Sequence, residues 1–258
     1  MSFIVFDLEF NQAYNGKSAD ASEESLKCPF EIIQIGAVKL NDKLETVATL
    51  DRLVKPYIFP KLHPFIKEMT GITKNNLSSA KDFKEVFQEF VDLTDGKDTI
   101  LCMWGTADMR ELFRNAQFYN LNTSLIPRKY INLQYYMSKF LSCEKGTNIG
   151  LKSTVELLGI PHNNEFHNAY NDAYFTAEIF KRIYCDKIKY RIYNPNDPNN
   201  TGRVRKSKMI LDSEGLIKQF EKMFNRKMSA EEIAIIKLAY MMGKTNQFQV
   251  EENNGVRS

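Results

Sequence analysis

The 258-residue sequence lacks the long hydrophobic run that a membrane-spanning helix needs. Its apolar stretches, such as FIVF at 3–6, are far shorter than the roughly 20 residues required to cross a bilayer. The N-terminal residues contain no basic region followed by a long apolar segment, so we expect no secretory signal. These absences predict a protein of the cytoplasm with no membrane partner.

Paired cysteines are also missing. The four cysteines are widely separated and form no C-x-x-C motif. This spacing favours free thiols in a reducing compartment over disulfides or a zinc site. The four positions are Cys28, Cys102, Cys143 and Cys185.

The composition is that of a folded protein, with 43% hydrophobic residues available for a core. The net charge of +3 is unevenly distributed. Residues 1–186 hold 21 Lys and Arg against 24 Asp and Glu, whereas residues 187–258 hold 14 against 8. The basic C-terminal part indicates either a polyanionic partner or a solvated terminal segment.

Hydrophobic periodicity predicts an α/β domain without internal repeats. Three leading strands precede helices that alternate with further strands, and the short link after the second strand predicts an antiparallel pair. Residues 11–29 are polar and predict a loop. The expected strands are 2–10, 31–40, 45–56, 98–105 and the start of 129–141, and the expected helices are 63–72, 81–94, 107–119, the end of 129–141, 150–160 and 168–188.

Composition divides the chain into three parts. Residues 1–186 form the α/β domain, 187–212 a basic linker rich in Asn and Pro, and 213–258 a helical appendage. The appendage should contain helices at 213–224 and 229–244, the second opened by a capping box of Ser229 and Glu232. Its apolar positions fit packing on a neighbouring element, a dimer contact or a guide for substrate.

Two acids end the first predicted strand. Because side chains alternate along a strand, Asp7 and Glu9 in DLE project from the same face. Adjacent carboxylates repel each other and lose solvation, and a hard cation such as Mg²⁺ or Mn²⁺ relieves both costs. The alternative is a solvated strand end.

Two later segments carry further candidates. Asp108, in WGTADMREL, follows a buried strand and begins a helix, where it would also interact well with the helix dipole. His167 and Asp172, in HNAYNDA, would be offset by roughly 140° on one helix. They can share a face only if His167 precedes the helix and turns back from the loop. The alternative for His167 is a surface or capping residue.

The ordered set of motifs resembles the DEDDh 3′–5′ exonucleases of the ribonuclease H-like superfold, which include proofreading and RNA-trimming enzymes. The matching segments are DLE, WGTADMREL and HNAYNDA, and the last fits the family pattern H-x-A-x-x-D-A. EIIQIGAV at 31–38, LVKP at 53–56 and TGIT at 70–73 are also similar. The branch with Tyr in place of His would need Tyr at position 168, where Asn168 stands. The resemblance covers residues 1–185.

This resemblance implies two-metal hydrolysis that releases nucleoside 5′-monophosphates from the 3′ end of single-stranded RNA or DNA. Asp7 would bridge two divalent ions, either Mg²⁺ or Mn²⁺. Glu9 and Asp172 would complete one metal site, and Asp108 would act through bound water at the other. His167 would be the general base, a task suited to a side chain that titrates near neutral pH.

Several residues are candidates for holding the substrate. Many relatives carry Thr directly after the D-x-E motif, whereas Phe10 stands here and either stacks on the terminal base or packs in the core. Leu8, His63 and Phe65 are the other candidates near the 3′ end. The DLEF and EIIQIGAV segments are most similar to the branch that includes RNA-trimming exonucleases, and this resemblance implies RNA rather than DNA as the preferred substrate. Phosphate contacts are expected from Arg203, Arg205, Lys206 and Lys208.

Two rival functions remain open. A catalytically idle binding module on the same fold would have no need for acids clustered beside a polyanion. A ribonuclease H-like endonuclease would cut circular substrates, which an exonuclease would not. The sequence leaves the oligomeric state open.

Overall fold

The computed structural model describes residues 2–13, 23–94, 98–144, 147–163, 165–197 and 213–244, without the side chains of 241–244. Contacts between residues divide the chain into a first unit, 1–200, and a second unit, 201–258. Within the described ranges, no helix is both long enough and apolar enough to cross a membrane.

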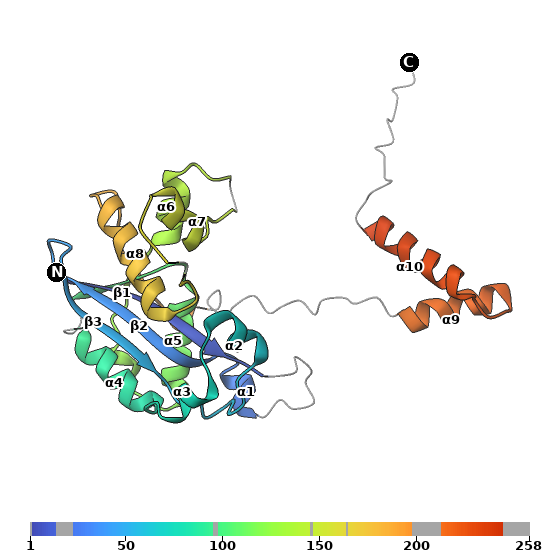
Figure 1. Ribbon diagram of the computed structural model, residues 1–258, viewed down its shortest axis with the longest axis horizontal. Coiled ribbons are helices and arrows are strands. Elements are labelled where there is room, and N and C mark those ends of the chain that lie inside the picture. Colours follow the sequence, from blue (N-terminus) through green and yellow to red (C-terminus); the bar gives the residue numbers. More distant parts are fainter. Residues whose placement is uncertain are drawn as a thin grey trace, which may run out of the picture. The chain divides into compact units, whose positions relative to one another are not determined.

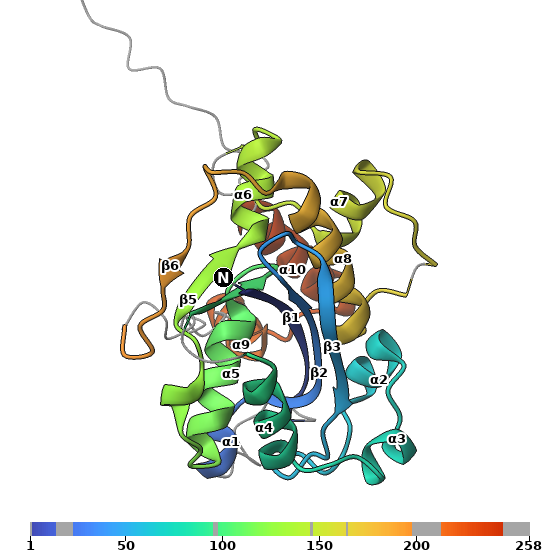
Figure 2. The same ribbon diagram turned by 90° about the vertical axis from the view of Figure 1, so that its left-hand side faces the viewer.

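A six-stranded mixed sheet forms the first unit, in the order β3-β2-β1-β4-β5-β6. Strand β2 pairs antiparallel with both β1 and β3, whereas β1, β4 and β5 run parallel, and β6 is antiparallel to β5. Figure 2 shows β6 beside β5 at one edge of the sheet. The strands are β1 (Ser2–Asn11), β2 (Glu31–Leu40), β3 (Thr46–Leu53), β4 (Thr99–Met103), β5 (Lys129–Asn132) and β6 (Arg191–Ile192).

Helices cover both faces of this sheet (Figure 1). On one face, α4 (Phe83–Leu93) and α5 (Ala107–Phe118) pack against Ile4, Phe6 and Leu8 of β1. On the other face, α8 (Ala169–Ile183) packs against Phe3 and Val5. Because side chains alternate, Asp7 and Glu9 belong to the face of α8. Helices α6 (Leu133–Phe140) and α7 (Leu151–Leu157) pack against α8.

The strand pairing shifts register at one place, between Glu9 and Phe10 of β1, where Ile33 of β2 has no opposing residue. This bulge reverses which residues of β2 face each side of the sheet. Ile32 packs in the core of α4 and α5, like Ile35, whereas Ile33 packs under the short helices α2 (Pro64–Thr70) and α3 (Lys74–Ser78).

Three short elements differ from the sequence prediction. Helix α1 (Glu23–Lys27) lies within the expected loop 11–29, and α3 follows α2. Strand β6 pairs with β5, so the sheet continues past residue 186 into the expected linker 187–212. The boundary expected at 186 is therefore too early. Elements of two to five residues carry too few repeats of a periodic pattern to be recognised. The structure also contains a 3₁₀ turn, η2 (Thr123–Leu125).

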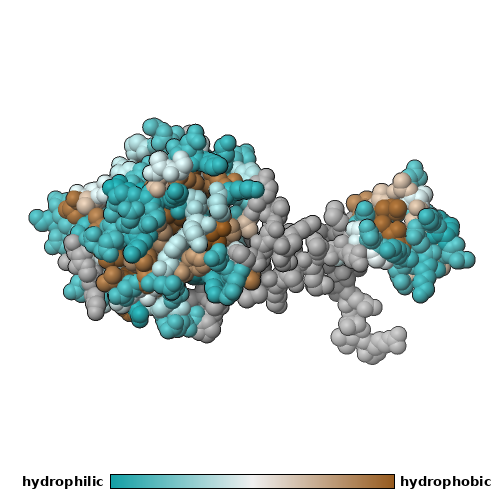
Figure 3. Space-filling view, turned by 90° about the horizontal axis from the view of Figure 1, so that it is seen from below, coloured by the Kyte–Doolittle hydropathy of each residue, from teal (hydrophilic) through white to brown (hydrophobic). Residues whose placement is uncertain are grey.

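The second unit contains α9 (Ser213–Phe224) and α10 (Ala230–Lys244), which contact each other. The expected capping box is present, because the Glu232 N–H donates to Ser229 Oγ and the Ser229 N–H donates to Glu232 Oε2. Large apolar side chains remain exposed on both helices, as the hydrophobic patch on this unit in Figure 3 shows.

Candidate active site

Four acids meet at the carboxyl end of β1. Asp7 and Glu9 project from β1, and Asp108 and Asp172 lie in the first turns of α5 and α8. Glu9 and Asp108 are each 6% exposed and Asp172 is 9% exposed. The sequence placed these acids at a strand end and two helix starts, and the fold brings them together.

Burial and mutual repulsion raise the pKa values of these four carboxyl groups. Burial, followed by the charges of Asp108, Asp172 and Glu9, raises the pKa of Asp7 well above its usual range. Burial and the charges of Asp172 and Asp108 raise the pKa of Glu9 to about 8. Burial raises the pKa of Asp108 to about 7 and that of Asp172 to about 6. Such a cluster favours binding of a cation.

His167 lies outside α8, the position that the sequence required for it to share a face with Asp172. It adopts a left-handed backbone conformation with φ of 63°. Its N–H donates to Asp172 Oδ2 at 3.2 Å, while the Asn168 side chain caps the helix. The exposed imidazole thereby returns toward the acids, and one ligand atom each from Glu9, His167 and Asp172 lie within 4.8 Å of one another.

One carboxylate oxygen of the site has no hydrogen-bond partner in the part of the chain that the structure describes. Asp172 Oδ1 is buried without a donor among the described residues, while Oδ2 accepts the His167 N–H. A buried, unpartnered carboxylate oxygen beside three other acids fits a divalent cation bound by oxygen ligands. The chemistry of the donor set therefore fits the expected metal site.

Close packing of α8 on β2 fixes the position of Asp172. A β-carbon added at Gly36, which pairs with Asp7, would lie 2.1 Å from the carbonyl carbon of Ala169. The neighbouring Gln34 is buried, accepts the Ala169 N–H through Oε1, and donates to Asp51 through Nε2. Gly36 thus allows the start of α8 to pack directly on β2, where Gln34 binds the Ala169 N–H.

An ion cluster centred on the buried Glu111 lies near Asp108 on α5. Glu111 is buried on α5, and both of its carboxylate oxygens lie 2.8 Å from Nη1 of Arg114. Arg110 Nε donates to the same carboxylate at 2.8 Å. Because the Arg110 charge lowers the pKa of Asp108 while that of Glu111 raises it, this cluster tunes the site.

Two buried polar residues hold segment 57–63 at the end of the sheet. The Glu31 carboxylate accepts the N–H groups of residues 57, 58 and 59 and the hydroxyl of Tyr119. Asn11, opposite Glu31, donates to the carbonyls of residues 59 and 61 and accepts the N–H of His63. Neither residue could be recognised from the sequence, because their partners lie far along the chain.

The expected substrate residues occupy different environments. Leu8 is wrong as a side-chain contact, because it is 4% exposed and faces the core of α4 and α5. Phe10 is half-buried against that core and meets Phe30 edge to face. His63 caps α2, its Nδ1 accepting the Phe65 N–H, and Phe65 is 57% exposed. Arg203, Arg205, Lys206 and Lys208 lie outside the described residues.

The chain is similar to known exonucleases. The family model described as Exonuclease (RNase_T) matches residues 4–180. The chain is 28% identical over 187 residues to the probable 3′–5′ exonuclease KapD of Bacillus subtilis, covering 72% of this chain and 86% of that protein. It is 26% identical to 3′–5′ exoribonuclease 1 of Homo sapiens, covering 72% of this chain and 54% of the human protein.

A solved structure gives the same class. The nuclease domain of 3′hExo, a DEDDh family member bound to rAMP, superposes with a TM-score of 0.61 at 25% identity. The match covers 75% of this chain and 96% of that domain. Homologues and structural neighbours are 3′–5′ exonucleases with a ribonuclease H-like fold, which confirms the predicted resemblance and enzyme class. The chain belongs to the exonuclease family.

Proposed function

We propose that the protein is a divalent-metal-dependent exonuclease that shortens single-stranded nucleic acid from its 3′ end. The observation that carries this proposal is the meeting of Asp7, Glu9, Asp108 and Asp172 with His167 at one end of the sheet. Hydrolysis of the terminal phosphodiester would release nucleoside 5′-monophosphates.

The acids would hold two metal ions, with Mg²⁺ or Mn²⁺ as the candidates. Glu9 and Asp172 would contribute to one site, Asp108 to the other, and Asp7 to both. When bound, the ions would offset the charge of the scissile phosphate and activate the attacking water. The unpartnered Asp172 oxygen and the high pKa values of the carboxyl groups support this assignment.

His167 would act as the general base. Its exposed imidazole lies beside Glu9 and Asp172, where it can accept a proton from water at the reacting phosphate. The hydrogen bond from its N–H to Asp172 would hold the backbone in place during that transfer.

Segment 57–65 supports a role in binding the 3′ end. The exposed Phe65 and the capping His63 begin α2, which follows the segment held by Asn11 and Glu31. The exposed part of Phe10 lies at the end of the strand that carries Asp7 and Glu9. These side chains would contact the terminal nucleotides, and aromatic rings there would stack on bases.

We propose RNA as the preferred substrate and the cytoplasm as the location. The relatives described above include an exoribonuclease and a domain bound to rAMP, which supports RNA. The four free cysteines support a reducing compartment. Arg203, Arg205, Lys206 and Lys208 remain proposed phosphate contacts, and the second unit remains a proposed guide or dimer element.

The test uses 5′-labelled RNA and DNA strands of one sequence, incubated with Mg²⁺, Mn²⁺ or EDTA. We expect a metal-dependent ladder of products shortened from the 3′ end, formed faster from RNA than from DNA. The Asp7→Asn variant should form no such products. This variant relieves repulsion among the acids, so it should remain folded. Its inactivity would therefore report lost chemistry.

Two outcomes would overturn the proposal. Cleavage of a circular strand would indicate an endonuclease. Tight binding of RNA without shortening, by folded and metal-loaded protein, would favour a catalytically idle binding module.

A further inference from the structure

A basic surface follows the edge of the sheet beside the site. The segments 128–140 and 187–196 together hold six Lys and Arg and contain neither Asp nor Glu. They form β5, α6 and β6, and β5 pairs with β6 through Lys129 with Ile192 and Tyr130 with Arg191. We name as the β5–β6 edge surface the residues Arg128, Lys129, Tyr135, Lys189, Tyr190 and Arg191.

Aromatic rings alternate with the cations on the β5–β6 edge surface. Tyr135 is 45% exposed, and the Arg191 guanidinium carbon lies 5.3 Å from its ring centroid. Tyr190 is 44% exposed, with Lys129 Nζ at 5.4 Å from its ring centroid. Exposed rings flanked by cations are the combination that binds single strands, since bases stack on rings while cations meet phosphates.

The surface is held in place by a hydrogen-bonded tyrosine. The Tyr136 hydroxyl donates to the Lys189 carbonyl at 2.8 Å and accepts the Lys189 N–H at 3.0 Å. This pair joins α6 to the segment entering β6, so Tyr135 and Arg191 stay together. A preformed platform lowers the ordering cost of binding a flexible strand.

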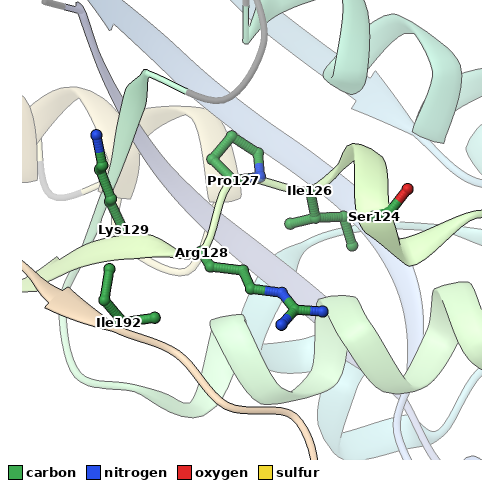
Figure 4. A pocket seen from close by; sticks show the side chains of 6 residues that line it. All are labelled: Ser124, Ile126, Pro127, Arg128, Lys129 and Ile192. Atoms are coloured by element: carbon green, nitrogen blue, oxygen red, sulfur yellow. The ribbon is translucent and has the colours of Figure 1, made fainter.

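The surface extends to Thr106, near the start of the helix that carries Asp108. Thr106, two residues before Asp108, lines a pocket with Asn132, Tyr135 and Arg191. The carboxyl ends of the parallel strands β1, β4 and β5 lie at the same end of the sheet, where Asn132 Oδ1 accepts the Gly105 N–H. From that end the β5–β6 edge surface follows β5 to a second pocket of about 370 Å³ that includes Arg128, Lys129 and Ile192 (Figure 4).

We propose that the β5–β6 edge surface binds the substrate strand on the 5′ side of the nucleotides being removed. This proposal rests on the proposed exonuclease function and extends it. It predicts that the enzyme holds long strands more tightly than short ones. Tyr135 would stack on a base, and Lys189 and Arg191 would contact phosphates.

The test measures binding by the Asp7→Asn protein, which should not consume its ligand. Fluorescent oligouridylates of about 4 and about 16 nucleotides cover the usual range of single-strand sites. We expect Tyr135→Ala and Arg191→Glu each to weaken binding of the long strand about tenfold. Arg191→Glu should also make the slope of log binding constant against log salt concentration shallower by ~0.7 per lost phosphate contact.

The matched control is Lys43→Glu, with the same sign of charge change. Lys43 is exposed in the turn after β2, at the end of the sheet away from Glu9. Folded Tyr135→Ala and Arg191→Glu proteins that bind the long strand as Lys43→Glu does would overturn the proposal. Equal affinity for polyglutamate of matched charge would overturn the assignment to nucleic acid. Failure of the unaltered enzyme to trim either RNA or DNA would instead refute the exonuclease function.

Discussion

The backbone of Ala169 lies so close to Gly36 that no β-carbon fits between them, since one placed there would lie 2.1 Å from the Ala169 carbonyl carbon. Gly36→Ala must therefore push the start of α8 away from β2. We expect the free energy of unfolding to fall by ~3 kcal/mol or more, because the Ala169 backbone cannot move aside as a flexible side chain can. Urea denaturation measures this.

The control for Gly36→Ala is Gly150→Ala. Gly150 has φ of −74°, and among the described residues an added β-carbon would meet Ser153 Oγ alone, at 3.9 Å. That variant should stay within about 0.5 kcal/mol of the parent. Equal stability of the two variants would show that α8 does not depend on its contact with β2.

The carboxyl cluster makes stability depend on pH when metal is removed. The pKa values of Asp172, Asp108 and Glu9 are about 6, about 7 and about 8, above the values near 4 of unfolded chains. The folded chain therefore binds protons more tightly, and it loses stability as the pH rises from about 4 through about 8. In EDTA, the melting temperature should fall by ~5 °C or more across this window.

Two comparisons isolate this effect. Mg²⁺ should restore the melting temperature at the alkaline end and change it little at the acid end. Asp7→Asn should flatten the pH profile in EDTA, because it removes one of the repelling charges. Profiles of parent and variant that run parallel, with no response to Mg²⁺, would contradict the mutual repulsion of these acids.

Substitutions at His167 should separate chemistry from backbone conformation. Asn tolerates positive φ well, so His167→Asn should keep the fold while lowering kcat by about 100- to 10,000-fold. His167→Val should lose activity and also about 1–2 kcal/mol of stability, since branched side chains oppose this conformation. His162→Asn, in the same loop, is the control and should retain kcat. Full activity of His167→Asn would exclude the general-base role.

Glu31 should prove essential for the shape of segment 57–63. Its carboxylate accepts three N–H groups and the Tyr119 hydroxyl. Glu31→Gln replaces an accepting oxygen with an amide N–H group that faces other donors. We therefore expect the free energy of unfolding to fall by about 2–3 kcal/mol. The rate of hydrogen exchange at the backbone amides of residues 57–59 should rise in the same variant.

Tyr119→Phe is the graded comparison, because it removes one of the four hydrogen bonds and should cost about 1 kcal/mol. A Glu31→Gln protein no less stable than Tyr119→Phe would mean that the three N–H groups find other partners.

The sequence predicted the parts of the site that local patterns encode. Alternation along β1 assigned Asp7 and Glu9 to one face, and the offset between His167 and Asp172 required the histidine to precede the helix, as it does. Glu31 and Gln34 could not be found this way, because what they bind is decided by tertiary contacts. Leu8 was misassigned because proximity to acids in the sequence ignores the opposite orientation of its side chain.

The extra residue in β2 supplies a side chain that a regular strand has no place for. Deleting Ile33 would make the pairing of β1 and β2 regular, and Glu31 and Ile32 would still lie opposite Asn11 and Phe10. Glu31 would thus keep its side of the sheet, whereas the layer beneath α2 and α3 would lose the buried Ile33. One irregular residue therefore anchors the short helices beside the catalytic end without disturbing the carboxylate that holds segment 57–63.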